Sequence, residues 1–161
     1  MARRSTIVVG VDGSESSRWA LRYALEDAVR RDGQVQAVQA FYPPEYWPAS
    51  WGLSAPPTVE QVTANLEVAT RQTVDTVVGE IGGAASGVPV EILVMPGSPA
   101  KVLVERAGPA DLLVVGHRGR LGFPGASLGS VALRCVQHAP CPVVVVRPSE
   151  VPAADPTAGT G

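Results

Sequence analysis

Lysine, cysteine and histidine are scarce in this chain of 161 residues, and each scarcity narrows the chemistry open to it. Lys101 is the only lysine, so we do not expect most kinds of chemistry that use a lysine side chain. The cysteines are Cys135 and Cys141, and their apolar neighbours favour reduced, half-buried thiols of a cytosolic protein over a disulfide or redox pair. The histidines, His117 and His138, have no partner at metal-ligand spacing, so we expect no metal site.

Excess charge of one sign and long hydrophobic runs are also lacking. The formal net charge is −2 and the arginines are scattered, whereas a nucleic-acid-binding protein usually carries a basic stripe. No segment reaches the roughly 18–20 apolar residues of a membrane span. The first apolar run stops at Val11 and meets Asp12, which makes it too short for the core of a signal peptide. These features predict a cytoplasmic protein with neither nucleic acid nor membrane as its partner.

Apolar segments of strand length alternate with amphipathic segments of helix length. The hydrophobic residues, 45% of the total, suffice for a buried core, and the length fits one domain. The expected strands span residues 6–11, 35–41, 88–95, 112–115 and 141–146, and the expected helices span 14–32, 58–81, 99–107 and 130–138. Such alternation forms right-handed βαβ units and a parallel sheet. The predicted fold is a single α/β domain over residues 1–148, a three-layer α/β/α sandwich around a five-stranded parallel sheet.

The helix faces and the connections carry further expectations. The inward face of the first helix is predicted to hold Trp19, Ala20, Ala24, Leu25, Ala28 and Val29, and that of the second Val62, Leu66, Ala69, Val74 and Val77 or Val78. Residues 42–57 are rich in proline and aromatic residues, which predicts an irregular excursion that folds onto the body. Residues 82–87 are expected to form a flexible connection, and residues 149–161 a disordered tail.

Two of the expected strand ends carry residues suited to a ligand. The first strand ends in Val11-Asp12-Gly13, and the fourth ends in Gly116-His117-Arg118-Gly119. Ligands of open parallel sheets bind beyond the carboxyl ends of the strands. These two ends therefore share one crevice if the first and fourth strands are neighbours.

Glycines at the fourth strand end and at the next helix start predict an anion site. Gly116 lacks a β-carbon and lets a ring or ribose approach the backbone. Gly119 can take a positive φ, which would turn successive N–H groups into an anion-binding nest. Gly129 and Ser130 open a helix, whose free N–H groups and dipole favour a phosphate, with the Ser130 hydroxyl as a further donor. For any one of these glycines alone, a plain surface loop is the alternative.

Charged side chains flank this predicted cradle. Arg118 and Arg120 would add positive charge at the mouth of the loop. The Asp12 carboxylate can accept hydrogen bonds from ribose hydroxyls or from an adenine amino group. Asp12 is equally suited to a helix N-terminus, where the dipole favours an acid, or to a turn at Asp-Gly. The spacing leaves these roles of Asp12 open.

Motifs of three other enzyme classes are incomplete in this sequence or lack the surrounding residues that they need. The stretch Gly125-Ala-Ser-Leu-Gly129 spells the hydrolase elbow, but loop residues precede it and no acid-then-histidine pair follows it. Residues 125–130 contain no lysine, which excludes a P-loop, and the dinucleotide glycine pattern is missing after the first strand. A serine hydrolase, a P-loop NTPase and a dinucleotide-binding enzyme are therefore not expected.

The pattern Gly116-x2-Gly119-x9-Gly129-Ser130 resembles the ATP-binding signature of the universal stress protein family. Residues 7–14, 94–99, 110–116 and 130–146 are also similar to blocks of that family, and the resemblance covers residues 4–148. It implies the strand order 3-2-1-4-5 of Rossmann-like, adenine nucleotide alpha hydrolase-like folds. It also implies a homodimer through the last strand, residues 143–146, as members of the family commonly form.

The resemblance implies an adenine nucleotide held from both ends. At the nucleoside end it assigns Asp12, the backbone around Val11, Ala40 and Val115, nearby Gly97, and Gly116 at the ribose. At the phosphate end it assigns Gly119, Gly129, Ser130 and Val131. Not all members of the family bind ATP, and some favour cyclic AMP.

The sequence therefore predicts a universal stress protein that binds ATP, with or without Mg²⁺, as a sensor or reservoir in the stress response. Fast phosphoryl transfer needs a metal-holding carboxylate and a positioned base, and Asp12 is the only acid expected near the cradle. We thus expect little or slow hydrolysis and no catalytic residue. The alternatives are a protein for cyclic AMP or AMP, a slow ATPase with His117 as base, and an interaction module acting through residues 42–51.

Overall fold

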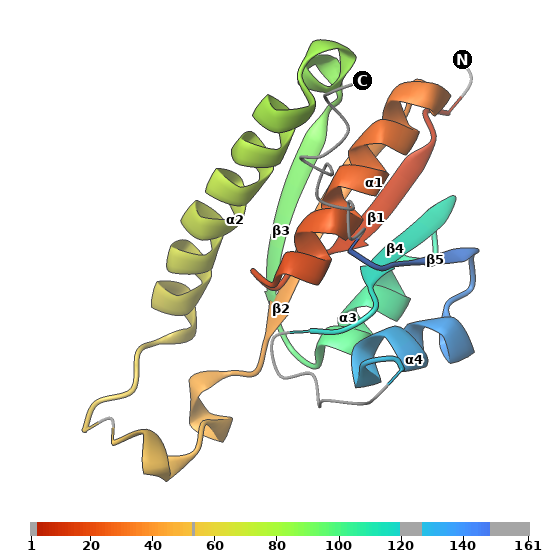
Figure 1. Ribbon diagram of the computed structural model, residues 1–161. Coiled ribbons are helices and arrows are strands. Elements are labelled where there is room, and N and C mark those ends of the chain that lie inside the picture. The colour runs from red at the N-terminus through yellow and green to blue at the C-terminus, as the bar shows by residue number, and fades with distance from the viewer. Residues whose placement is uncertain (1–2, 53, 120–126, 149–161) are drawn as a thin grey trace, which may run out of the picture.

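The structure is a computed structural model, and it describes residues 3–52, 54–119 and 127–148. Its sheet has five parallel strands in the order β3-β2-β1-β4-β5, as predicted (Figure 1). The strands are β1 (Thr6–Gly10), β2 (Gln34–Phe41), β3 (Val90–Pro96), β4 (Leu112–Gly116) and β5 (Val143–Val146). The α-helices are α1 (Glu15–Arg31), α2 (Val59–Ile81), α3 (Pro99–Arg106) and α4 (Ser130–His138).

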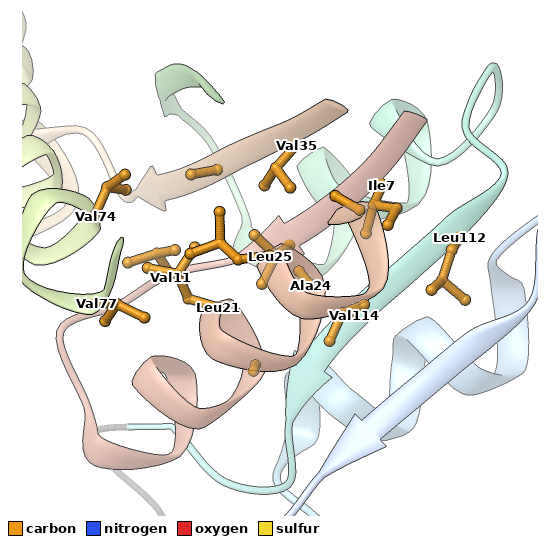
Figure 2. Packing of buried hydrophobic residues seen from close by; sticks show 14 residues of the cluster. Ile7, Val11, Leu21, Ala24, Leu25, Val35, Val74, Val77, Leu112 and Val114 are labelled. Atoms are coloured by element: carbon orange, nitrogen blue, oxygen red, sulfur yellow. The ribbon is translucent and has the colours of Figure 1, made fainter. Parts of the chain in front are cut away.

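Helices cover both faces of the sheet, and successive residues of a strand enter different layers. Ile7 and Val9 of β1 pack in the cluster that includes α1 and α2, whereas Val8 packs in the cluster that includes α3 and α4. All three side chains are fully buried. Figure 2 shows the first cluster, in which Leu21 and Leu25 of α1 face the sheet. Burial on both faces explains why the strands are continuous apolar runs, and it confirms the three-layer sandwich.

Helix α1 is bounded by the residues that the sequence indicates. The hydroxyl of Ser14 accepts a hydrogen bond from the Ser17 N–H at 3.1 Å, and the left-handed Asp32, with φ of 50°, ends the helix. The predicted inward face is wrong at Val29, which is exposed, and it omits Leu21, which is fully buried. The way α1 lies on the sheet decides which positions are covered, and the helical period alone does not specify this.

Helix α2 shows a second correction. Ala69 was predicted to face inward but is exposed, and Thr70 is buried in its place. The Thr70 hydroxyl donates a hydrogen bond to Oε1 of Gln39 on β2 at 2.5 Å. This partner satisfies the polar side chain, so a threonine takes a position that the hydrophobic pattern reserves for an apolar residue. The predicted inward positions Val62, Val74 and Val77 are confirmed as buried.

The proline-rich excursion after β2 packs on itself. It contains two short 3₁₀ helices, Pro44–Tyr46 and Ala49–Trp51, and the rings of Trp47 and Trp51 lie 5.4 Å apart. The indole N–H of Trp47 donates to the Tyr42 carbonyl at 2.7 Å. The expectation that these aromatic side chains fold onto the body is wrong for Tyr42, Tyr46 and Trp51, which are more than half exposed. Figure 1 shows the segment projecting beyond the end of β2.

The remaining expectations concern connections, thiols and the chain end. Residues Gly83–Gly87 form a 3₁₀ helix with Ala85 buried, where a flexible connection was expected. Cys135 and Cys141 are free, and burial raises the pKa of Cys135 to about 11. No helix in the described part of the chain is long and apolar enough to cross a membrane. The predicted tail, residues 149–161, lies outside the described residues, so the domain boundary stays a prediction.

Candidate functional site

The two strand ends singled out in the sequence lie side by side. Strands β1 and β4 are parallel neighbours, with Ile7 opposite Leu112 and Val9 opposite Val114. Their carboxyl ends therefore reach the same edge of the sheet, as the sequence predicted on condition of this pairing. The turn after β1 and the chain after β4 meet there, and we call this place the cradle: residues 11–14, 116–119 and 129–131.

Asp12 closes a turn with one carboxylate oxygen and presents the other to the chain after β4. Its Oδ1 accepts a hydrogen bond from the Ser14 N–H at 2.9 Å, which closes a turn ahead of α1. Its own N–H donates to the Ser17 hydroxyl at 3.3 Å. The other carboxylate oxygen, Oδ2, lies 2.9 Å from the point where a β-carbon on Gly119 would stand. The turn thus fixes the carboxylate and directs one of its oxygens at the chain after β4.

The reasons that the sequence suggested for two glycines are not those that the structure shows. Gly119 is not among the described glycines of positive φ, so the nest expected there is absent from this backbone. Gly116 was expected to leave room for a ring or ribose, but a β-carbon there would lie 2.8 Å from the backbone carbon of Ser16 and 2.9 Å from its oxygen. Gly116 therefore serves the close packing of β4 on α1, and Gly119 leaves space for Asp12.

The start of α4 lies against residues 117–119. Gly129 is the N-cap of α4, with no side-chain cap and no acidic residue in the first turn. Its N–H donates to the His117 carbonyl at 2.7 Å, and a β-carbon on Gly129 would stand 3.3 Å from the Cα of Arg118. Ser130 is exposed and Val131 is half-buried at the head of the helix. A bare helix N-terminus with its positive dipole end favours an anion at this position.

The residues expected at the nucleoside end lie along the same edge. Val11 packs in the layer of α1 and α2, while Val115 packs in the layer of α3 and α4, so both side chains are buried away from the edge. Only their backbone is available there. Ala40 lies near the end of β2, and the N–H of Gly97, whose φ is 141°, donates to the Phe41 carbonyl at 2.8 Å.

His117 has a role at this site that the sequence analysis did not identify. Its ring Nδ1 lies 3.0 Å from Oγ of Ser16, in the first turn of α1. Burial, followed by the cations of Arg118 and Arg147, lowers the pKa of His117, and a hydrogen bond to the Val146 backbone acts in the opposite direction. The imidazole is therefore neutral at neutral pH. Nothing in the spacing points to Ser16, because the two residues are 101 positions apart.

Two other predictions about charge and metals bear on this site. The N–H of Arg118 donates to Ser16 Oγ at 3.4 Å and its side chain is half-buried, while Arg120 lies outside the described residues. In the described part of the chain no cluster of three or more histidine, cysteine and acidic side chains could hold a metal ion.

An open groove of about 480 Å³ lies between α1 and α2, and Gly13 is the one residue of the cradle that lines it.

A family model and several known proteins match this chain. The model of the Universal stress protein family matches residues 3–147. A universal stress protein of Mycobacterium tuberculosis is 32% identical over 154 residues, which cover 91% of this chain and 46% of that protein. The chain thus spans about half the length of the curated relatives that it matches.

Solved structures share the fold. A universal stress protein in complex with cAMP is 26% identical and has a TM-score of 0.63, with 92% of this chain and all of that one covered. The universal stress protein from Archaeoglobus fulgidus in complex with dAMP has a TM-score of 0.54, with 90% of this chain and 98% of that one covered. At 19% identity the second structure shows the fold alone.

Proposed function

Because the chain belongs to the universal stress protein family, we propose that it binds an adenine nucleotide, ATP foremost, at the cradle. In this proposal the protein acts in the cytoplasm as a sensor or reservoir in the stress response and hydrolyses the nucleotide slowly or not at all. The observation that carries the proposal is the meeting of Asp12, Gly119 and the bare start of α4 at one edge of the sheet. A carboxylate opposite an anion site suits a ligand with hydroxyl or amino donors at one end and phosphates at the other.

Each part of the cradle has chemistry to offer a nucleotide. Asp12 Oδ2 would accept hydrogen bonds from ribose hydroxyls or from the adenine amino group. The N–H groups of Ser130 and Val131 and the helix dipole would bind phosphate oxygens, and the Ser130 hydroxyl would donate one more hydrogen bond. The glycines fit this use, since a β-carbon at Gly119 would meet Asp12 Oδ2 and one at Gly129 would meet the backbone of Arg118. Arg118 would add positive charge.

The identity of the nucleotide is tested on the protein as purified. Ligand released by heat is identified by chromatography, and ATP, AMP and cyclic AMP are then titrated by calorimetry. The cAMP complex of a solved family member keeps cyclic AMP among the candidates. We expect binding tighter than millimolar by at least one of the three, and its failure for all three would end the proposal.

A glycine pair supplies matched variants for this test. Gly129→Val should abolish binding, because even its β-carbon would stand 3.3 Å from the Arg118 Cα. Gly79→Val is the control, since a β-carbon on Gly79, in α2, meets nothing within 4 Å. Omitting Mg²⁺ or adding a chelator during the titrations decides whether the metal accompanies the nucleotide.

A slow ATPase with His117 as base is the enzymatic alternative. The ring Nδ1 lies 3.0 Å from Ser16 Oγ, so Nε2 could act as the base only in the tautomer that carries its proton on Nδ1 and donates it to Ser16. Single-turnover hydrolysis distinguishes the two proposals. A rate that His117→Ala leaves unchanged would rule out His117 as the base, whatever the size of that rate.

We also propose that two copies pair through β5. This strand stands at the edge of the sheet, so one side of its backbone has no neighbouring strand within the described fold. Leu133 and Val136 of α4, a helix that contacts β5, are 45% and 50% exposed and are further apolar side chains that a partner could cover. Pairing would cover both.

Exposed aromatic side chains support an interaction module as the candidate of another class. Tyr42, Tyr46 and Trp51 in the excursion are 55%, 72% and 59% exposed. In this proposal a bound nucleotide biases that surface toward a partner. Tryptophan fluorescence in a Trp19→Phe background tests the coupling, because Trp47 and Trp51 then report from the excursion. Emission that does not change at saturating nucleotide would remove this candidate.

A further inference from the structure

His117 connects three elements that surround the cradle. Its backbone N–H donates to the Val146 carbonyl at the end of β5 (2.9 Å), and its carbonyl accepts from the Gly129 N–H at the start of α4 (2.7 Å). Its ring Nδ1 lies 3.0 Å from Oγ of Ser16 in the first turn of α1. The ring contact belongs to the side chain, so substitution can remove it and leave both backbone hydrogen bonds in place.

Ser16 is a well-anchored partner for this contact. It is 7% exposed, and its backbone packs against Gly116. Its Oγ accepts a hydrogen bond from the Arg118 N–H at 3.4 Å. The hydroxyl hydrogen is then available to Nδ1 of His117, which accepts it while the imidazole is neutral and carries its proton on Nε2. Burial and the cations of Arg118 and Arg147, which lower the pKa of His117, favour that neutral form.

We infer that His117 is a positioning residue for the phosphate half of the cradle and acts through the contact of its Nδ1 with Ser16. The contact holds His117 and Arg118, directly after β4, against α1. It thereby sets where the N–H groups at the start of α4 stand relative to Asp12, whose own turn is part of the α1 start. This inference rests on the proposed binding of an adenine nucleotide at the same site.

Substitutions of the pair separate positioning from folding. His117→Ala and Ser16→Ala each remove the contact. His117→Asn keeps it, because the asparagine amide oxygen stands where the histidine Nδ1 stood and accepts from the Ser16 hydroxyl. His138→Ala is the matched control, since His138 is exposed at the far end of α4. Urea denaturation checks that all variants fold.

Calorimetric titration with ATP and with adenosine, which lacks phosphates, gives the decisive comparison. We expect His117→Ala and Ser16→Ala to bind ATP roughly three- to tenfold more weakly, the range of one lost hydrogen bond, and to bind adenosine as the wild type does. His117→Asn should regain the wild-type affinity. The double alanine variant should bind ATP no more weakly than Ser16→Ala alone, because Ser16→Ala already removes the contact with His117 together with the hydrogen bond from the Arg118 N–H.

Specific results would overturn the inference. These are an unchanged ATP affinity in His117→Ala, an equal loss for ATP and adenosine, or an asparagine variant as weak as the alanine variant. A wild-type protein that binds neither ligand would instead overturn the proposed function. Amide hydrogen exchange of Gly129 then still decides whether His117 holds the loop. Faster exchange in His117→Ala than in His138→Ala supports the positioning role, and equal rates contradict it.

Discussion

Asp12 Oδ2 lies 2.9 Å from the point that a β-carbon of Gly119 would occupy, so the carboxylate takes up the space that a side chain at position 119 would need. Gly119→Ala should push the carboxylate aside and weaken nucleotide binding by about tenfold, since an overpacked methyl group costs about 1–3 kcal/mol. Calorimetry measures the loss. Gly87→Ala is the control, because its β-carbon meets nothing within 4 Å. Equal affinities in the two variants would contradict a role for this contact.

The hydrogen bond from Thr70 to Gln39 predicts that a substitution which removes it lowers the stability of the protein even when the volume of the side chain is kept. Thr70→Val keeps the shape of the side chain but removes the donor to Gln39 Oε1, and Thr70 is 1% exposed. We expect the free energy of unfolding to fall by about 1 kcal/mol in urea denaturation. Thr76→Val should change it by less than about 0.5 kcal/mol, because exposed Thr76 bonds only its own helix. Similar values for both variants would show that the buried bond adds nothing.

The lowered pKa of His117 predicts a pH dependence of stability with a defined sign. The unfolded chain binds the proton near the ordinary value of 6.5, whereas the folded protein binds it only at lower pH. The contribution of His117 is therefore fully present above pH 6.5 and is lost as the pH falls through the folded pKa. His117→Asn cannot titrate, so its unfolding free energy should decline less than that of the wild type below pH 6.5. Urea denaturation at pH 7.5 and pH 5 of both proteins measures the difference, and parallel declines would refute it.

Pairing through β5 predicts a change of mass in solution. Leu133→Asp and Val136→Asp place a charge on exposed apolar positions of α4, the helix that contacts β5, and both should shift the protein from dimer to monomer. Light scattering after size-exclusion chromatography measures the mass. Val68→Asp is the control, because Val68 is 60% exposed on α2, which packs against β3 at the opposite edge of the sheet from β5. A wild-type monomer, or charged variants that stay dimeric, would contradict the proposal.

The sequence located the elements well where local signals are strong. The N-cap Ser14 and the end of α1 at Asp32 depend on interactions within one turn of that helix, so neighbouring residues suffice to find them. The burial of Ile7, Val8 and Val9 likewise followed from a continuous apolar run.

The errors share one physical origin, which is contact with a distant segment. Thr70 faces inward because Gln39 accepts its hydrogen, and Val29 faces outward because of how α1 lies on the sheet. Gly116 and Gly119 are needed for close approach to Ser16 and Asp12, and not for the open space or positive φ expected from their residue type. A glycine in a sequence shows that no side chain is present, but the sequence does not show which atoms occupy the space that a side chain would take.

By itself, then, the sequence determined the class of fold and the family to which the chain belongs. These depend on the period of apolar residues and on a spaced glycine pattern, which are properties of short segments. Only the tertiary structure decided that Asp12 faces Gly119 and that His117 meets Ser16 across 101 positions. Such pairs form because β1 and β4 are neighbours in the sheet, and no local preference of either segment contains that pairing.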